Sequence, residues 1–145
     1  MTRGSMRREV VIGVDADTAW GVVGRPDQLH RWFPGIVDCH VDGDVRTVTL
    51  GTGLTLDETI LTHDPLQRRF QYRITGGFFT EHLASVDVIA LDDTSCLVTY
   101  ASDAAPAAMA VVLGGATASA LAELKRQLEA GATPPSRARV AEDAA

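Results

Sequence analysis

The alternation of apolar and polar residues along the first third of the chain predicts one strand and two short helices. A β-branched stretch at 8–14 is typical of a strand. Asp15 then provides an N-cap for a short helix at 16–23, which Gly24 ends. A second short helix is expected from Pro26, a residue favoured in the first helical turn. The apolar face of this second helix would consist of Leu29, Trp32 and Phe33.

The middle of the chain alternates with a period of two residues, which is typical of strands. Asp42-Gly43 is a tight-turn signal, because this pair accepts the positive φ angles that a hairpin turn requires. Further turns follow at Gly51-Thr52-Gly53 and at Gly76-Gly77. The pattern therefore predicts six consecutive antiparallel strands, at 36–41, 45–50, 54–62, 69–75, 81–91 and 95–101.

The last predicted element is a helix of about twenty residues that begins at Pro106, because its apolar residues recur with a helical period. Gly114 and Gly115 fall inside it, where each glycine costs about 1 kcal/mol relative to alanine. Either the helix bends there or another group approaches its backbone closely. The apolar positions of this helix are Met109, Val112, Leu113, Ala116, Ala120, Leu121, Leu124 and Leu128.

Together these elements predict an α+β fold in which a curved antiparallel sheet of about seven strands wraps around the long C-terminal helix. The two short helices after the first strand would close one end, and an internal cavity would remain between sheet and helix. One domain is expected at 6–130. A tail at 131–145, with two prolines and no apolar period, is expected to be disordered. Residues 4–6 resemble a cloning junction, so whether residues 1–5 are native is left open.

Composition excludes several classes of protein. Thirteen Lys and Arg residues stand against nineteen Asp and Glu residues, which gives a net charge of −6 and no basic excess for nucleic acid. No apolar run reaches the ~20 residues of a membrane span, so no stable membrane insertion is expected. No signal peptide is evident. Cys39 and Cys96 lie far apart without metal-ligand spacing, and no histidine motif for a metal is present. We therefore expect a cytoplasmic protein without a metal or other cofactor.

Glu58 is the first candidate for chemistry. It shares one face of a predicted strand with Leu56 and Ile60, so the carboxylate would face inward among apolar neighbours. Burial there would raise its pKa, as suits a general acid or base or a polar anchor for a ligand. The alternatives are an exposed glutamate or one paired with Arg46 or Arg73.

His82 and Tyr72 are the other two candidates. His82 shares a face with Ala84, and an imidazole suits proton transfer near neutral pH. A hydrogen-bonded histidine at the cavity rim is the plainer alternative. Tyr72 would donate a hydrogen bond to a carbonyl or enolate oxygen, or serve as a core ring. Tyr100 is expected to point inward from the last strand. The catalytic residues stay unknown, with these three as candidates.

Two segments and the final helix resemble the START/Bet v 1-like (SRPBCC) superfamily, specifically its bacterial polyketide cyclase/dehydrase and lipid-transport group. The segments are DADTAWGVVGRPDQLHRWFPGI at 15–36 and RTVTLGTGLTLDETILTHD at 46–64. The matching positions are Ala19, Trp20, Trp32, Phe33, Pro34, Gly35, Arg46, Val48, Leu50, Gly53, Leu56, Glu58, Ile60 and Asp64.

This resemblance implies a helix-grip fold with a ligand cavity between the sheet and the long helix. In the plant abscisic-acid receptors of this superfamily, a glutamate at the position of Glu58 faces the cavity. The lysine that those receptors use for the ligand carboxylate is replaced here by Val37, and Gly51-Thr52-Gly53 is a plain turn instead of their gate loop. A hormone-receptor role is therefore not expected.

Three functions follow from these observations. The first is binding of a small hydrophobic molecule, such as a lipid, polyketide or aromatic metabolite, in the cavity. The second is a cyclase- or dehydratase-type enzyme that uses Glu58, His82 and Tyr72. The third is an interaction or stress protein with an incidental cavity, and a homodimer through the convex sheet face stays open. The expected ligand-binding residues are Trp32, Val48, Leu56, Glu58, Ile60, Tyr72, His82, Ala84, Tyr100, Met109 and Leu113.

Overall fold

Seven antiparallel strands form one sheet in the computed structural model, which describes residues 2–131. Their order across the sheet is β1-β7-β6-β5-β4-β3-β2. Each strand from β2 to β6 therefore pairs with the next one along the chain, and β1 pairs with β7. The predicted tail lies, from residue 132 onward, outside the described residues. The strands are β1 (Gly4–Ile12), β2 (Ile36–Asp42), β3 (Val45–Leu50), β4 (Thr55–Asp64), β5 (Arg69–Ile74), β6 (Glu81–Asp92) and β7 (Ser95–Ala105).

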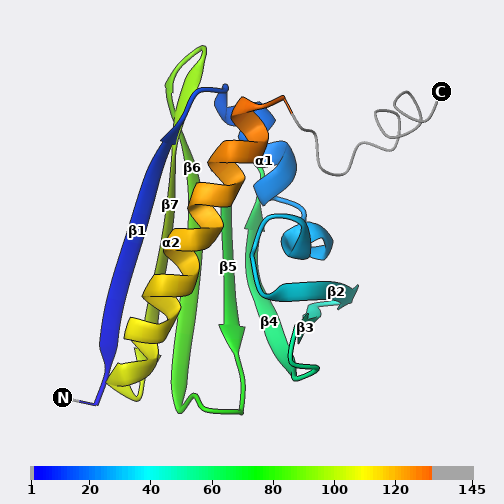
Figure 1. The fold of residues 1–145 in the computed structure, drawn as a ribbon, viewed down its shortest axis with the longest axis vertical. Helices are drawn as coiled ribbons and strands as arrows, with labels where there is room; N and C mark the ends of the chain where they lie inside the picture. Colours follow the sequence, from blue (N-terminus) through cyan, green and yellow to red (C-terminus); the bar gives the residue numbers. More distant parts are fainter. Residues whose placement is uncertain (1, 132–145) are drawn as a thin grey trace.

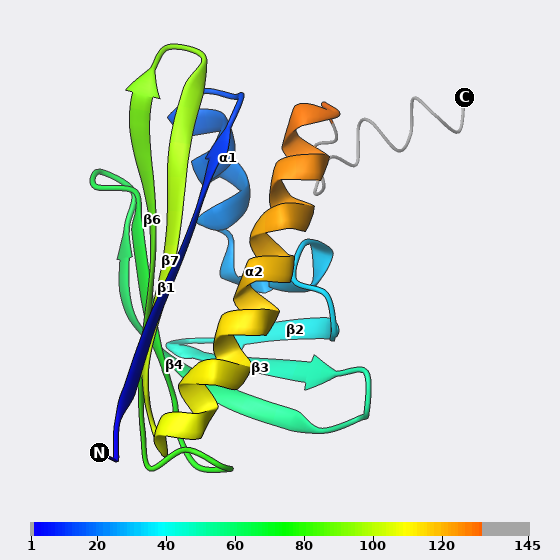
Figure 2. The same ribbon diagram turned by 60° about the vertical axis from the view of Figure 1, so that its left-hand side comes forward.

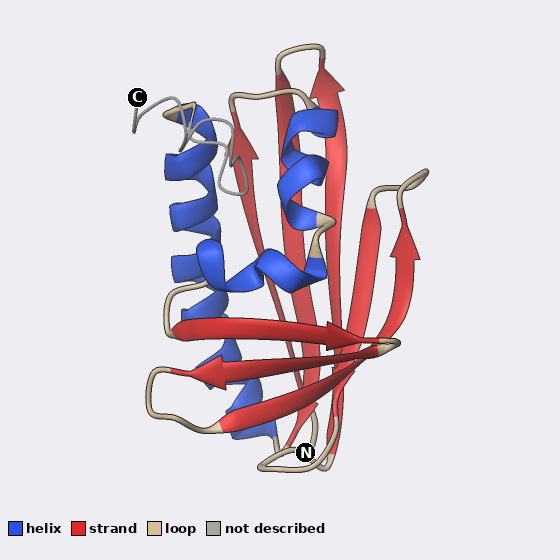
Figure 3. Cartoon of the chain, turned by 90° about the vertical axis from the view of Figure 1, so that its right-hand side faces the viewer, coloured by secondary structure: helices blue, strands red, loops and turns tan. Residues whose placement is uncertain are grey.

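The sheet curves strongly, and β2, β3 and the start of β4 lie across the direction of β1, β6 and β7 (Figure 3). A register shift between Ile60 and Thr62 interrupts the pairing of β4 with β5. Such a bulge adds an unpaired residue to one strand and bends it. This bend allows β4 to pair with β3 on one side and with β5 on the other while the sheet turns around its concave face.

Two short helical segments follow β1, as the sequence predicts. Helix α1 (Ala16–Val23) begins at Asp15, whose side chain accepts a hydrogen bond from the backbone N–H of Thr18 at 3.2 Å. Gly24 is its C-cap. The second segment, η1 (Pro26–Arg31), is a 3-10 helix that contacts β2 and places the buried Leu29 over the concave face.

The long helix α2 (Ala107–Glu129) packs on β1 and β7 and covers the concave face (Figures 1 and 2). It continues through its glycine pair without interruption. A Cβ built on Gly114 would lie 2.7 Å from Nη2 of Arg8, so a close approach explains that glycine. Among the described residues, α2 is the one helix with the length and apolar composition of a membrane span, and 33% of its most apolar window is buried in the fold.

The inward faces of the strands follow the predicted alternation. Phe70, Tyr72 and Ile74 of β5 are buried together, as are His82, Ala84 and Val86 of β6. On β7 the buried set is Cys96, Val98 and Tyr100, so Tyr100 points inward. The core thus lies between the concave face of the sheet, α1 and the second half of α2.

Two predicted strands differ from the observed ones by more than two residues at one end, and one predicted helix differs in kind. Strand β1 begins at Gly4 and ends at Ile12, where the sequence predicts 8–14, and β7 continues to Ala105 instead of ending at 101. The two extensions have one cause, since Gly4 to Met6 pair with Ala104 to Ser102. Small and polar residues have weak strand propensity, but a partner strand overrides it. The third difference is that the second helix is a 3-10 segment.

Candidate ligand-binding cavity

A cavity of about 530 Å³ lies between the curved part of the sheet and the first half of α2. Its lining is almost entirely apolar, and Glu58 is its one charged residue. Four parts of the chain build it: the segment after η1, strands β3 to β5, the β5–β6 loop and α2. The lining residues are Leu29, Phe33, Pro34, Gly35, Ile36, Val48, Leu50, Gly51, Thr52, Leu54, Leu56, Glu58, Tyr72, Ile74, Phe78, Phe79, Met109, Val112, Leu113 and Ala116.

Glu58 is held by a buried ion pair with Arg46. The two residues are opposite each other on β4 and β3, and the Arg46 Nε atom lies 2.6 Å from the Glu58 Oε1 atom. Their side chains are 3% and 4% exposed. The Arg46 guanidinium also lies 4.8 Å from the ring centre of Tyr72 and 5.2 Å from that of Phe70. Among the alternatives of an exposed Glu58 and a Glu58 paired with Arg46 or Arg73, the structure therefore shows the pair with Arg46.

This ion pair limits the chemistry that Glu58 can perform. Burial raises the pKa of the Glu58 carboxyl, and the Arg46 charge and hydrogen bond oppose that shift. One carboxylate oxygen is already occupied by the guanidinium. The other oxygen, Oε2, stays able to accept a hydrogen bond, so the ion pair holds the carboxylate as a fixed polar group in the cavity wall.

Tyr72 and Tyr100 form a buried hydrogen bond between their hydroxyl groups. Burial raises the pKa of both phenols, so both are neutral at physiological pH. Tyr72 lines the cavity, whereas Tyr100 lies behind it. The hydroxyl group of Tyr72 therefore already has one hydrogen-bond partner, the hydroxyl group of Tyr100.

A small space lies behind Tyr72, between Arg46, Trp32 and Tyr100. Its volume of about 10 Å³ is room for one water-sized group. Two buried donors in its walls, Nη2 of Arg46 and Nε1 of Trp32, have no hydrogen-bond partner among the described residues. Buried donors generally have a partner, so this space is suited to a hydrogen-bond acceptor.

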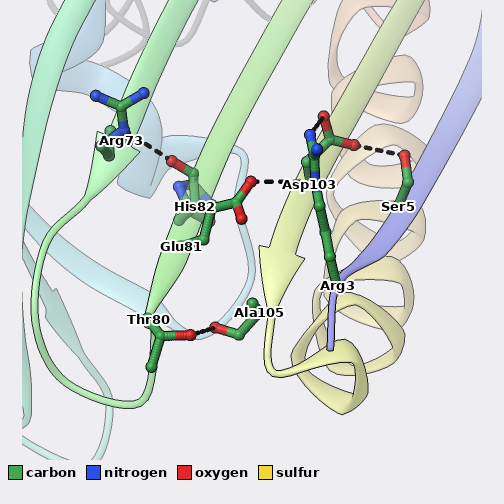
Figure 4. Close-up of polar contacts among 8 residues, drawn as sticks. All are labelled: Arg3, Ser5, Arg73, Thr80, Glu81, His82, Asp103 and Ala105. Carbon is green, nitrogen blue, oxygen red and sulfur yellow. Dashed lines mark hydrogen bonds and ion pairs between the residues drawn. The ribbon is translucent and has the colours of Figure 1, made fainter. Parts of the chain in front are cut away.

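His82 is 1% exposed and lies beside the cavity without lining it. Its Nδ1 atom accepts a hydrogen bond from the backbone N–H of Ile74 at 3.0 Å, and its carbonyl accepts one from Nε of Arg73 (Figure 4). Desolvation, with a contribution from the Arg73 charge, lowers its pKa to about 4. The imidazole is thus neutral, and its buried Nε2 has no partner among the described residues.

The sequence-predicted site residues separate into three groups. Val48, Leu56, Glu58, Tyr72, Met109 and Leu113 line the cavity. Trp32 and Tyr100 line the small space behind Tyr72. Ile60, His82 and Ala84 line neither space. Glu58 and His82 do not bond to each other, since Glu58 bonds to Arg46 and His82 bonds to Ile74.

Several residues that line the cavity were not predicted to bind a ligand. They lie in loops or at helix positions beside the predicted residues. Phe78 and Phe79 follow a glycine pair and have no alternation partner that would indicate their direction. Val112 and Ala116 lie three and seven residues after Met109, so the helical period that marked Met109 also contains them.

A second groove of about 490 Å³ lies between η1 and β2, but it is a polar surface feature. Asp27, Gln28, His30 and His40 line it, and it contains none of the predicted site residues. Within residues 2–131, no group of three or more His, Cys, Asp or Glu side chains could hold a metal ion. The apolar cavity is therefore the site on which a function can be argued.

Residues 3–129 match the model of the family described as polyketide cyclase / dehydrase and lipid transport. The chain belongs to this family. That match covers the cavity and both elements that enclose it, and it agrees with the START/Bet v 1-like fold expected from the sequence. A comparison with curated proteins finds no match.

Solved structures of low sequence identity share the fold. XoxI from Bacillus cereus has a TM-score of 0.80 at 19% identity, with 85% of this chain and 94% of that chain covered. Norcoclaurine synthase from Thalictrum flavum, in complex with dopamine and hydroxybenzaldehyde, has a TM-score of 0.68 at 16% identity, covering 87% and 86%. The di-domain ARO/CYC protein BexL, from the BE-7585A biosynthetic pathway, has a TM-score of 0.75 at 17% identity, covering 86% and 46%.

Proposed function

We propose that this family member binds a small, largely apolar molecule in the cavity between the sheet and α2. The observation that carries the proposal is a cavity of about 530 Å³ whose single charged residue is already ion-paired. Sites for small molecules are typically ~300–1,000 Å³, apolar and furnished with few polar groups. A metabolite with an aromatic or aliphatic body fits that description, and a strongly charged one does not.

Glu58 and Tyr72 are the proposed polar contacts of the ligand, and the apolar contacts are Val48, Leu56, Met109 and Leu113. The unpartnered donors of Arg46 and Trp32 behind Tyr72 support a ligand that carries an acceptor oxygen. Such an oxygen would be attracted toward this end of the cavity. Norcoclaurine synthase, whose structure contains dopamine and hydroxybenzaldehyde, supports an aromatic body of similar size.

A cyclase-type enzyme is the second candidate, and one observation favours it. Glu58 is a buried carboxyl of raised pKa that lines the cavity beside Tyr72. Against it, Glu58 is bound by Arg46, Tyr72 by Tyr100, and His82 lies outside the cavity lining. An activity screen on aromatic polyketide-like substrates, comparing the unaltered protein with Glu58→Gln, addresses this candidate. Turnover that the variant loses would favour the enzyme over the binding protein.

Filling the cavity tests the binding proposal. Ala116 lines the cavity from α2, whereas Ser119 is exposed on the same helix and does not line it. We expect Ala116→Trp to weaken binding of the uncharged fluorescent probe N-phenyl-1-naphthylamine at least about tenfold, a loss of about 1.4 kcal/mol. Ser119→Trp should change it less than about twofold, since it adds the same side chain outside the cavity.

Native mass spectrometry of freshly purified protein, beside a denaturing extraction, gives the identity of any ligand retained from the cell. A stoichiometric hydrophobic passenger that Ala116→Trp loses and Ser119→Trp keeps would support the proposal. Equal probe affinity in both tryptophan variants, measured by fluorescence titration, would contradict it.

A further inference from the structure

Most side chains around the cavity mouth are uncharged, although the exposed Asp57 shares a surface groove there with Leu54 and Phe78. Four segments supply the outer lining, at 33–37, 47–56, 74–80 and 104–122, and none contains Asp, Glu, Lys, Arg or His. The whole chain nevertheless has 13 Lys and Arg and 19 Asp and Glu residues. Because these segments are far apart in sequence, the fold itself gathers the uncharged stretches on one side of the molecule.

Large apolar side chains of these segments are exposed at the mouth. Leu54, Phe78 and Val112 line the cavity and yet are 47%, 68% and 61% exposed. Val37 is 58% exposed and lies beside Gly51, which lines the cavity. We call these four residues the apolar rim. They lie on β2, the β3–β4 turn, the β5–β6 loop and the first half of α2, which meet in the lower half of Figure 2.

Two local features present this rim to the outside. Gly76 and Gly77 both have positive φ angles, of 81° and 65°, and this backbone, which favours glycine, leads directly into the exposed Phe78. In the uncharged first half of α2, Val111 and Val112 are 78% and 61% exposed, so this part of the helix presents apolar side chains to the surface. An aromatic loop tip beside an apolar helix face is suited to a membrane interface.

We propose that the apolar rim docks on an electrically neutral lipid surface, from which the cavity takes its ligand or to which it delivers it. The inference rests on the proposed binding function. For a molecule that fits the apolar cavity, transfer into water is unfavourable because its apolar surface becomes exposed. When the rim contacts a lipid layer directly, the ligand passes between the layer and the cavity without entering water. This path exists because Leu54, Phe78 and Val112 belong both to the rim and to the cavity lining.

The charges favour a neutral surface over an anionic one. The protein has a net charge of −6, and no cation lies in the four mouth segments. Anionic lipids would repel such a molecule, since they attract only basic segments. A second copy on the rim would cover the mouth and block passage of the ligand, so a lipid surface is the occupant to which the proposal commits.

Vesicle co-sedimentation tests the proposal, with phosphatidylcholine vesicles as the probe. We expect the unaltered protein to bind them, and Phe78→Ser to bind about tenfold more weakly because the largest rim side chain is lost. Val37→Asp should also bind more weakly, because a carboxylate enters the neutral rim. The matched control is Leu66→Asp, since Leu66 is 91% exposed in the turn between β4 and β5, away from the mouth. Leu66→Asp makes the same charge change and should bind like the unaltered protein.

Two further measurements separate this proposal from the binding function. Val37 does not line the cavity, so Val37→Asp should keep the affinity for the uncharged probe N-phenyl-1-naphthylamine while losing vesicle binding. Vesicles that contain anionic phosphatidylglycerol should bind less protein at low salt. Absence of vesicle binding, or equal losses in Val37→Asp and Leu66→Asp, would overturn the rim proposal alone. A dimer in light scattering that Phe78→Ser dissociates would assign the rim to a second copy instead.

Discussion

At the scale of single residues, the buried Arg46–Glu58 pair explains both the shape and the chemistry of the cavity wall. Its two side chains are almost fully buried, and Arg46 also contacts the rings of Phe70 and Tyr72. Buried ion pairs contribute little net stability compared with apolar residues, but removal of one partner leaves a charge without compensation. The pair therefore acts as one unit in which neither side chain can change alone.

Glu58→Leu should lower the free energy of unfolding by about 3–5 kcal/mol, because Arg46 would stay buried and unpaired. The double variant Arg46→Met with Glu58→Leu should recover most of that loss. Asp57→Leu is the matched control, since Asp57 is exposed on the same strand and bonds only to Thr47, and we expect a change below about 0.5 kcal/mol. Urea denaturation measures all three, and equal losses in Glu58→Leu and Asp57→Leu would refute this account.

At the scale of elements, α2 combines two tasks that favour different residues. Its second half buries Leu121, Leu124 and Leu128 against the sheet and stabilises the fold. Its first half contains the glycine pair and lines the cavity through Met109, Leu113 and Ala116. The small residues leave space that a well-packed helix would fill, so the cavity exists partly because this half packs less.

The two glycines of α2 should respond differently to replacement by alanine. Gly115 has no neighbour within 4 Å of a built Cβ, so Gly115→Ala should raise the free energy of unfolding by about 0.5–1 kcal/mol through helix propensity. Gly114→Ala should gain less, because its Cβ would require the Arg8 guanidinium to move. Urea denaturation of both variants gives the comparison. A larger gain from Gly114→Ala would mean that Arg8 makes no close contact there.

At the scale of the whole molecule, the buried His82 couples protonation to unfolding. Its ring is enclosed by Tyr72 and Phe79 and has a pKa of about 4 in the folded protein, against 6.5 as its ordinary value. Charged groups near it are Arg73, which lowers this pKa, and Asp103, which raises it. Between these two pKa values the unfolded chain binds a proton at this position that the folded protein does not.

The stability of the fold should therefore decrease as the pH falls from about 6.5 to about 4. The unfolded chain binds more protons in this range, so acid favours the unfolded state. Protonation of His82 in the unfolded chain then lowers the free energy of unfolding by about 3 kcal/mol near pH 4. Above pH 6.5 this contribution disappears. His82→Gln should flatten this part of the curve, whereas His40→Gln, a variant of an exposed histidine, should not. Unfolding measured across this pH range would disprove the coupling if both variants behave alike.

Local patterns along the chain were enough to predict the fold class and the inward faces of the predicted strands that begin at 54, 69, 81 and 95. Alternation of period two marked Glu58, Tyr72, His82 and Tyr100 as inward-facing, and the helical period marked α2 as the covering helix. These patterns are reliable because burial of an apolar side chain is favourable whichever residues it packs against. The match over residues 3–129 and the shared folds agree with this part of the prediction.

Only the tertiary structure decided which inward residues share a space and which partners they have. Alternation cannot tell that Arg46 rather than His82 bonds to Glu58, or that Ile60 and Ala84 lie outside the cavity lining, because both depend on the bend of the sheet. Pairing with β7 extended β1 to Gly4, although local propensity does not favour a strand there. The apolar rim likewise exists only in the fold, which brings four separate uncharged segments to one mouth. Local patterns report burial, whereas contacts between distant segments depend on the curvature of the whole sheet.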